Sequence, residues 1–393
     1  MHPPGDRSAQ SLAFALAPRH AGAMCALHGT RSAVITEVDP PASPDTSPDW
    51  RHAGVTMIDE ALAMEVDGNT DLADTTAMLV GSLANQRNVE KHLFIAVDES
   101  DPQTVLGRAR VNASRRDNLH AAWVEIGVLP SARRRGIGSG LWQRALEQVR
   151  TMGRTTVMTA TSTAPEPAED ETFALSAPTG VGRVDTRDEG VRFARSLGFS
   201  LEQVERHSVL DLPVDPDLLK RLGERSAAAA GPDYALVSWH GRVPDEWLEH
   251  YCILQTRMST DSPLAGLDLH EAEWDPERVE AHDKVLRDMG VGTITTAALH
   301  RPSRTLAGFT VIETPREKAE VVGQEYTLVL KEHRGHRLGM LVKAANLQLL
   351  ARDYPQARRI HTGNAQENSF MLDINVALGF RQASVWGAWQ LVL

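Results

Sequence analysis

Two turns rich in glycine and arginine have the composition of phosphate-binding segments. The first runs from Val128 to Gly138 as VLPSARRRGIG, and the second runs from Val329 to Gly339 as VLKEHRGHRLG. Glycine lets a backbone approach an anion closely, and the free amides at the start of a helix point toward it. The arginines add positive charge. Taken alone, either string is equally well explained as an exposed basic turn without a ligand.

Side chains suited to proton transfer or to hydrogen bonding accompany the second turn. Glu325 and Tyr326 precede it, and Asn368 and Asn375 follow it. A carboxylate can accept a proton from a substrate as a general base, and a phenol can donate one as a general acid. Glu125 precedes the first turn, but all 4 tyrosines lie in the second half. The alternative for either glutamate is a solvated carboxylate at the end of a strand.

The same order of elements surrounds each turn. Strands are predicted over 92–97, 104–111 and 123–129 in the first half, and over 293–299, 305–312 and 327–330 in the second. Each turn leads into an apolar stripe with helical spacing, formed by Leu141, Ala145, Val149 and Met152 in one half and by Leu341, Ala345 and Leu349 in the other. This order predicts an internal duplication.

Two landmarks measure how the copies differ in length. Gly339 lies 201 residues after Gly138, whereas the Leu-Gly-Phe at 378–380 lies 181 residues after the one at 197–199. The first copy therefore carries 20 extra residues between these landmarks. The stretch 161–182 is rich in Pro, Glu and Thr, which is typical of a surface loop, so we expect the insertion there.

Breaks in composition predict the domain boundaries. Residues 1–50 are interpreted as a poorly ordered leader, because Asp6 and a short apolar stretch do not fit a signal peptide and prolines follow at 40–48. The predicted domains are 51–212 and 234–393, joined by a linker over 213–233.

Composition excludes several classes of protein. The 393 residues are 42% hydrophobic and 24% charged, with a net charge of −11, which argues against a dedicated nucleic-acid binder. No apolar run approaches the ~20 residues of a membrane span, so no membrane partner is expected. Cys25 and Cys252 are the 2 cysteines, too few for a disulfide framework or a structural zinc site. Their small number suits a reducing cytoplasm, where we expect the protein. No pattern indicates an oligomeric state.

A V-x-x-x-x-R-x-x-G-x-G turn between strand and helix, followed by Leu-Gly-Phe, resembles the GNAT superfamily of N-acetyltransferases. The resemblance covers about residues 55–210 and 234–393. It implies an α/β (α+β) chain of two tandem GNAT domains, each a mixed, mostly antiparallel sheet flanked by helices. It also implies acetyl-coenzyme A as co-substrate, no metal, and transfer of an acetyl group to an amine.

In this family the turn wraps the pyrophosphate of the coenzyme and the preceding strand pairs with its pantetheine arm. The resemblance implies coenzyme contacts at Val128, Arg133, Arg134, Arg135, Gly136, Ile137 and Gly138, and at Val329, Arg334, Gly335, His336, Arg337, Leu338 and Gly339. The second turn departs from the pattern because Arg337 replaces a glycine. We expect this side chain to require an ordinary helical backbone.

Many family members carry a tyrosine shortly before Leu-Gly-Phe, which protonates the leaving thiolate. Ala194 and Asn375 occupy that position here, and the asparagine that accompanies it is Arg187 in the first copy and Asn368 in the second. The second copy is therefore predicted to be catalytic, with Glu325, Tyr326, Asn368 and Asn375 in its site. The expected acceptor is a small-molecule amine. The alternative is a non-catalytic acyl-CoA-binding or regulatory protein.

Overall fold

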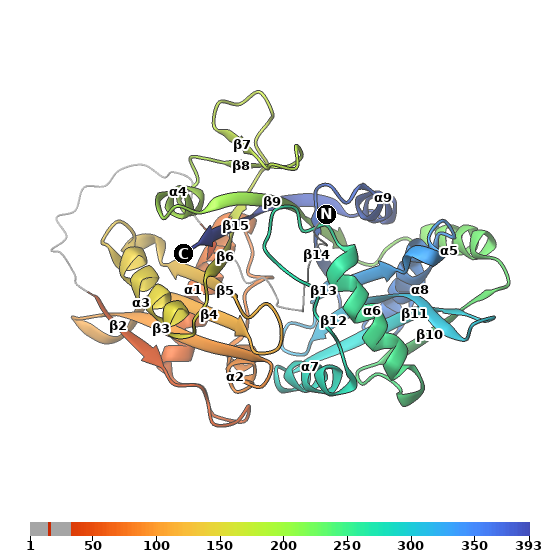
Figure 1. The fold of residues 1–393 in the computed structure, drawn as a ribbon, viewed down its shortest axis with the longest axis horizontal. Coiled ribbons are helices and arrows are strands. Elements are labelled where there is room, and N and C mark those ends of the chain that lie inside the picture. The colour runs from red at the N-terminus through yellow and green to blue at the C-terminus, as the bar shows by residue number, and fades with distance from the viewer. Residues whose placement is uncertain (1–14, 17–32) are drawn as a thin grey trace. The chain divides into compact units, whose positions relative to one another are not determined.

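The computed structural model describes residues 15–16 and 33–393. Most of the predicted leader, 1–14 and 17–32, lies outside the described residues. The described residues form two compact units, whose elements are labelled in Figure 1. The N-terminal unit extends to Glu205 and also contains Ala265–Asp268 and Ser384–Leu393, whereas the C-terminal unit contains Arg206–Leu264 and Leu269–Ala383.

These units differ from the predicted domains in three places. The predicted linker is mostly helix α5 (Pro216–Ala230), because Asp215 caps its first turn and its apolar side packs on helix α8. The last ten residues belong to the N-terminal unit, because strand β15 (Arg381–Val392) pairs antiparallel with β6 (Thr156–Thr163). Strand β2 (Ala33–Val38) lies within the predicted leader.

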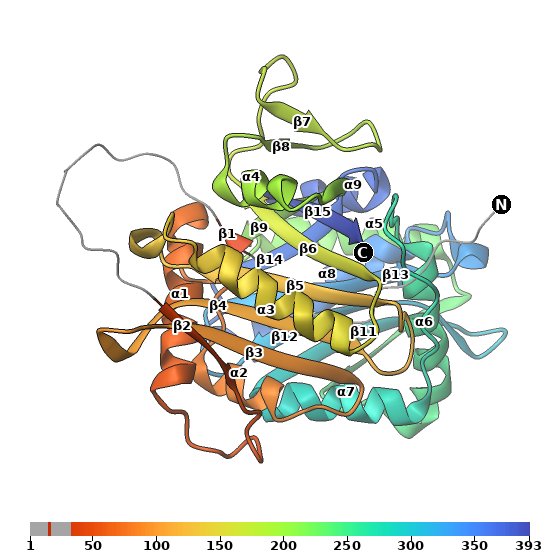
Figure 2. The ribbon, with the colours of Figure 1, turned by 60° about the vertical axis from the view of Figure 1, so that its left-hand side comes forward.

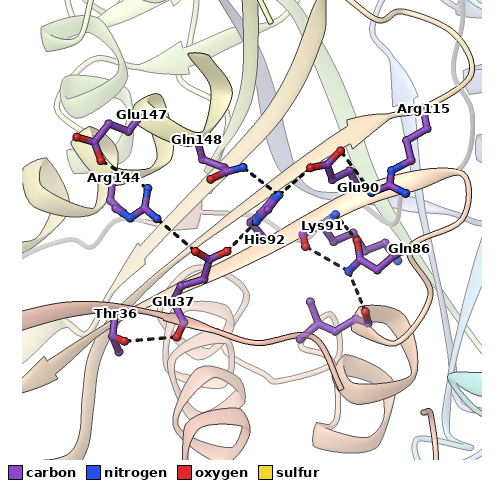
Figure 3. A network of polar contacts seen from close by, with 11 residues as sticks. Thr36, Glu37, Gln86, Glu90, Lys91, His92, Arg115, Arg144, Glu147 and Gln148 are labelled. Atoms are coloured by element: carbon purple, nitrogen blue, oxygen red, sulfur yellow. Dashed lines mark hydrogen bonds and ion pairs between the residues drawn. The ribbon is translucent and has the colours of Figure 1, made fainter. Parts of the chain in front are cut away.

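Side-chain contacts explain why β2 is part of the fold (Figure 3). Glu37 of β2 accepts a hydrogen bond from Arg144 at 3.2 Å, and its other oxygen lies 2.7 Å from Nδ1 of His92. Nε2 of the same imidazole lies 3.1 Å from Glu90. Both ring nitrogens of His92 therefore face carboxylates, and this network joins β2 to its neighbouring strand and to helix α3.

The N-terminal unit is a sheet with strand order β2-β3-β4-β5-β6-β15. Phe94 and Ala96 face a core that includes α3, whereas Leu93 and Ile95 face the core beneath α1 and α2, as the alternation of side chains along a strand requires. Figure 2 shows α3 lying across the strands. The remaining elements are β1 (Ala15–Leu16), α1 (Trp50–Asp67), α2 (Thr76–Leu83), β3 (Val89–Asp98), β4 (Asp101–Ser114), β5 (Ala121–Val128), η1 (Pro130–Ala132), α3 (Ile137–Thr151), β7 (Ala174–Ser176), β8 (Arg183–Asp185), α4 (Glu189–Ser196) and β9 (Ser200–Asp211), which continues into the C-terminal unit. The strands predicted in this half are confirmed, and the insertion is a loop that contains the β7–β8 hairpin.

The C-terminal unit repeats this plan, with strand order β10-β11-β12-β13-β14-β9. Helices α6 and α7 pack with Phe309 and Val311 on one face of the sheet, and α8 packs with Ile294 and Ile312 on the other. The elements are β10 (Tyr234–His240), η2 (Asp245–Trp247), α6 (Leu248–Asp261), α7 (Pro276–Asp288), β11 (Val291–His300), β12 (Thr305–Pro315), β13 (Val321–Val329), η3 (Lys331–His333), α8 (Leu338–Asp353), β14 (Arg359–Ala365) and α9 (Ser369–Leu378). The strands predicted in this half are also confirmed.

A lysine lies on the buried side of α8. Lys343 is 1% exposed, between the core residues Met340 and Leu347, and its Nζ lies 5.4 Å from the centre of the Phe380 ring. Burial lowers the pKa of this amine to about 7, because the charged form loses its hydration. The unfolded chain keeps a pKa near ~10.4 and binds a proton more readily. The folded state therefore loses stability as the pH falls from about 10 toward 7.

We expect Lys343→Met to raise the free energy of unfolding by about 2–4 kcal/mol at pH 7. The gain should shrink as the pH approaches about 10, where the lysine is neutral in both states. Urea denaturation at pH 7 and pH 9.5 measures the difference. Lys220→Met is the matched control, because this lysine on α5 is exposed. Equal effects of the two substitutions would contradict the assignment.

Candidate functional site

The two turns have the same backbone conformation, but glycine and arginine occupy its two left-handed positions in opposite order. Each turn places two residues in the left-handed region, at Arg134 (φ 62°) and Gly136 (φ 81°) in one copy and at Gly335 (φ 89°) and Arg337 (φ 56°) in the other. The expectation that Arg337 requires an ordinary helical backbone is therefore wrong. The turn imposes its conformation on whichever residue occupies these positions, at a cost in strain for arginine.

The helices that follow the turns begin without a side-chain cap. Side chains cap the first turns of α1, α2, α4, α5, α7 and α9, whereas none caps α3 or α8, or α6, which follows a short 3-10 turn. The first four amides of a helix have no partner within the helix. At α3 and α8 these amides are therefore available to an external acceptor, and an anion such as a phosphate suits them.

The first arginine of each turn is held by the protein itself. Arg133 donates from Nε to the Val128 carbonyl at 3.2 Å and from Nη2 to Glu65 of α1 at 2.7 Å. Arg334 repeats both contacts, to the Val329 carbonyl at 3.2 Å and to Asp261 of α6 at 2.8 Å. These two guanidinium groups fasten each turn to a helix of its unit, α1 in one and α6 in the other, which is a structural role that the sequence did not indicate.

The other predicted contact residues fall into two groups. Arg134, Arg135, Gly136, Gly335, His336 and Arg337 are exposed, and Arg135 donates to the Ser131 carbonyl at 2.5 Å. Ile137 and Leu338 are buried and anchor the helices. Gly138 has ordinary space around it, whereas a Cβ at Gly339 would lie 3.1 Å from Ile374. Coenzyme contact at all these residues stays a prediction.

We expect Arg337→Gly to stabilise the folded protein by about 1 kcal/mol, because glycine adopts the left-handed conformation without steric cost. Gly335→Ala should destabilise it by a similar amount, because it introduces a Cβ at the other left-handed position. Chemical denaturation of the two variants measures these opposite signs. Changes of the same sign would show that backbone conformation does not dominate at this turn.

In each unit the strand before the turn separates from its parallel neighbour. β5 pairs with β6 only over Ala121–Trp123, and β13 pairs with β14 only over Val321–Gly323. Beyond these pairs, the strand edges that face the neighbour carry backbone groups without ladder partners. The opening is suited to an extended ligand with amide groups, which is the place that the resemblance gives to the pantetheine arm.

A β-bulge distinguishes the C-terminal opening from the N-terminal one. Thr310 pairs with Thr327 and Ile312 pairs with Gln324, so Glu325 and Tyr326 together oppose one residue of β12. The β4–β5 ladder is regular from Gly107 to Asn112 and shows no such shift. Of the two copies, the C-terminal one therefore has two successive residues, Glu325 and Tyr326, outside the regular ladder beside the opening.

Polar side chains hold the bulge in place. Gln324 donates from Nε2 to the Val311 carbonyl at 2.8 Å and to Thr310 Oγ1 at 3.0 Å. The Thr310 hydroxyl donates to the Tyr326 carbonyl at 3.1 Å. At the point where the strands separate, Thr362 of β14 donates to the Gln324 carbonyl at 3.0 Å. Backbone carbonyls that lose their partner in the strand ladder therefore accept hydrogen bonds from side chains instead.

The two candidate catalytic residues of the bulge have different surroundings. Glu325 is exposed, whereas Tyr326 is buried among aromatic side chains and stacks on Phe309. Loss of solvation raises the pKa of Glu325 although part of its surface is open. Glu313 of β12, which the sequence did not single out, has its pKa raised by burial and by the charge of Glu325. Two carboxyl groups near each other favour retention of one proton.

The two asparagines have different surroundings. Asn368 caps α9, because its side chain accepts a hydrogen bond from the Met371 amide at 3.3 Å. Asn375 is 1% exposed and donates from Nδ2 to Asn364 Oδ1 of β14 at 2.7 Å. The Asn375 Oδ1 atom is buried without a hydrogen-bond partner. An unsatisfied buried oxygen is costly, and a donor from a ligand would relieve that cost.

The glutamate on the strand before the N-terminal turn lies in a closed charge cluster. Glu125 is 8% exposed, and its Oε2 lies 3.6 Å from Arg110 and 4.0 Å from Arg108. Asp59 of α1 accepts hydrogen bonds from both arginines, at 2.5 Å and 2.7 Å for their Nη2 atoms. Burial raises the pKa of Glu125 to about 7, against the opposing effect of the arginines. This cluster joins α1 to the sheet.

We expect Gln324→Leu to destabilise the protein by about 1–3 kcal/mol, because backbone carbonyls at the bulge lose their donor. Gln348→Leu is the matched control, since this glutamine on α8 is exposed. Denaturation measures the loss of stability, and proton exchange of the amides at 325 and 326 reports whether the bulge persists. Equal stability of both variants would contradict the role assigned to Gln324.

Comparison with known proteins defines the class of this fold. The family model "Acetyltransferase (GNAT) family" matches residues 62–170. A tandem GNAT protein from the clavulanic acid biosynthesis pathway is similar at 25% identity and a TM-score of 0.66, over 92% of this chain and 98% of that one. A GCN5-related N-acetyltransferase from Sphaerobacter thermophilus shares the fold at 12% identity and a TM-score of 0.56, over 92% and 95% of the two chains. None of the curated protein sequences matches the chain.

The family match lies in the N-terminal part of the chain, and the similarity to a tandem GNAT protein extends over 92% of the chain. The fold class predicted from the sequence is thereby confirmed. The family and the tandem neighbour support acyl transfer in general. Within the described residues, no helix is both long and apolar enough to cross a bilayer.

Proposed function

We propose that the C-terminal unit transfers an acetyl group from acetyl-coenzyme A to an amine of a small molecule. The observation that carries this proposal is the bulge at Glu325 and Tyr326 beside the opening between β13 and β14. A backbone amide turned out of register can donate to the thioester carbonyl and stabilise the negative charge that develops on it. The N-terminal unit has the opening but not the bulge.

Glu325 is the base of the proposed reaction. Its raised pKa brings it closer to the pH at which it must accept a proton from the ammonium group of the acceptor. The raised pKa of Glu313 favours its neutral form, so the charge of Glu325 is the one that attracts a cationic acceptor. We assign Asn375 to contact with the coenzyme, since an amide cannot act as an acid at neutral pH. Asn368 contributes by capping α9, and Tyr326 by fixing the bulge against the aromatic core.

The N-terminal unit is proposed to bind coenzyme without turning it over. Its Glu125 is buried in the cluster with Asp59, Arg108 and Arg110, so it is poorly placed to receive a proton from a substrate. Ala194 occupies the family's tyrosine position and is buried. Asn375 occupies the family's tyrosine position in the C-terminal unit, which favours a second candidate function in which both units bind acyl-CoA and neither is catalytic. We further propose a cytoplasmic location with no metal and no nucleic-acid or membrane partner.

Release of thiol from acetyl-coenzyme A in the presence of a panel of cationic amines tests the activity. With an accepted amine, Glu325→Gln should lower kcat by ~10²–10⁴-fold, the range for loss of a general base. Glu125→Gln is the matched control and should change kcat little. The reverse ranking, in variants that still bind acetyl-coenzyme A, would move the chemistry to the N-terminal unit. No turnover with any amine would favour the binding function.

A further inference from the structure

Helix α1 of the N-terminal unit carries large apolar residues on two sides. Ile58 and Leu62 are buried in the core between α1 and the sheet. On the other side, Trp50, Met57 and Met64 are 37%, 61% and 52% exposed. A helix that packs on a sheet with one face normally presents charged and polar residues to solvent on the other. The outer face of α1 therefore has the composition of a second packing surface.

The exposed positions of α1 recur at regular spacing. They are Trp50, Ala53, Met57, Glu60 and Met64, which follow one another in alternate steps of 3 and 4 residues. This is the spacing of a helix that packs along another helix. Single apolar residues scattered on a surface need no partner, but here three large ones lie on one line along the helix. We call these five residues the α1 stripe.

The corresponding helix of the C-terminal unit has no such stripe. Helix α6 holds its turn through Asp261 as α1 does through Glu65. The exposed residues of α6 are Glu249, Ile253 and Arg257, of which two are charged. The GNAT-like fold is therefore built without an apolar outer face on this helix. The α1 stripe belongs to one copy and calls for an explanation other than folding of the unit.

The α1 stripe is self-complementary under a two-fold rotation about Met57. Trp50 and Met64 lie 7 residues on either side of it, and both are large and apolar. In an antiparallel pair of α1 helices, Trp50 of one copy faces Met64 of the other, and Met57 faces its own counterpart. Ala53 then faces Ala61, and these small side chains let the two helices approach closely. Two-fold dimers are built on self-complementary contacts of this kind.

The charges along α1 favour the antiparallel arrangement. Glu60, Glu65 and Asp67 lie in its C-terminal half, whereas Arg51 lies in its first turn, where Asp49 accepts a hydrogen bond from it at 2.8 Å. Antiparallel pairing brings the acidic half of one helix beside the Arg51 end of the other, and it also opposes the two helix dipoles. Parallel pairing would place the exposed Glu60 side chains next to each other, where like charges repel.

We propose that α1 is a dimerisation surface, on which a second copy of this chain packs its own α1 in antiparallel orientation through the α1 stripe. The surface has no part in the acetyl transfer proposed above. A single pair of helices buries less area than the roughly 1,200–2,000 Å² of a standard stable interface. The dimer is therefore reversible, and its population rises with protein concentration.

Sedimentation equilibrium of the full chain at increasing concentration tests the dimer. The mass should rise from the 43.0 kDa of one chain toward twice that value. Met57→Glu places two like charges at the two-fold axis and should raise the dissociation constant at least about tenfold. Ile253→Glu is the matched control, because it adds the same charge at an exposed apolar residue of α6, and it should leave the dimer intact.

Disulfide formation distinguishes the two orientations. Single cysteines are introduced into a chain in which Cys25 and Cys252 are replaced by Ala. Met57→Cys should crosslink to itself, because the two side chains meet at the axis within reach of a disulfide. Met64→Cys should not, because it lies 14 residues of helix, roughly 21 Å, from its counterpart. It should crosslink to Trp50→Cys when the two variants are mixed.

A chain that stays monomeric at every concentration, or a dimer that survives Met57→Glu, would overturn this inference. Self-crosslinking at both 57 and 64 would also overturn it, because only parallel helices allow both. A dimer that is lost in Met57→Glu and that crosslinks between 57 and 57 and between 50 and 64 would support it. Acetyl transfer is measured separately, so the result for the dimer does not depend on the proposed function.

Discussion

The separation of one pair of parallel strands in each unit is the constraint on which the site depends. A sheet normally satisfies its backbone groups by continuous pairing, so an opening inside it must be held by other means. In the C-terminal unit, Thr362, Gln324 and Thr310 take over the bonds that the ladder gives up. The opening is therefore stabilised by specific side-chain hydrogen bonds. It places a strand edge, a carboxylate and a helix start beside one another along β13 and the turn that follows.

The two copies keep this opening but differ in what surrounds it. Both turns retain the left-handed positions and the arginine that ties the turn to α1 or to α6, because these features fix the path from strand to helix. The face of the sheet beyond the turn is less constrained. In the N-terminal unit this face carries Asp59 and two arginines, whereas in the C-terminal unit Glu325 is exposed to solvent. Conserving the turn while changing the neighbouring face gives two related sites with different chemistry.

The elements nearest to the turns could be predicted from the sequence because they depend on local patterns. Alternating or helical apolar spacing and a glycine-rich turn between them specify strand, turn and helix at both Gly138 and Gly339. The conformation of Arg337 could not be predicted this way, since its sequence alone favours a helical backbone. It adopts the left-handed region because the strand and helix on either side fix the turn. The helical α5 was missed because its Ala and Gly resemble a linker until it packs on α8.

The features that decide function depend on contacts between residues far apart in the chain. The burial of Glu125 in an ion cluster depends on Asp59, which lies on a helix whose position no local pattern indicates. The second carboxyl group beside Glu325 is that of Glu313, which lies there through a register that a single bulge sets. A slip of one residue would turn one of these carboxylates to the opposite face. A glutamate on the strand before each turn thus becomes an open carboxylate in one copy and part of a buried ion cluster in the other, according to long-range packing. For this reason the turn identifies the class of protein, whereas the neighbouring strands determine which copy can carry out the reaction.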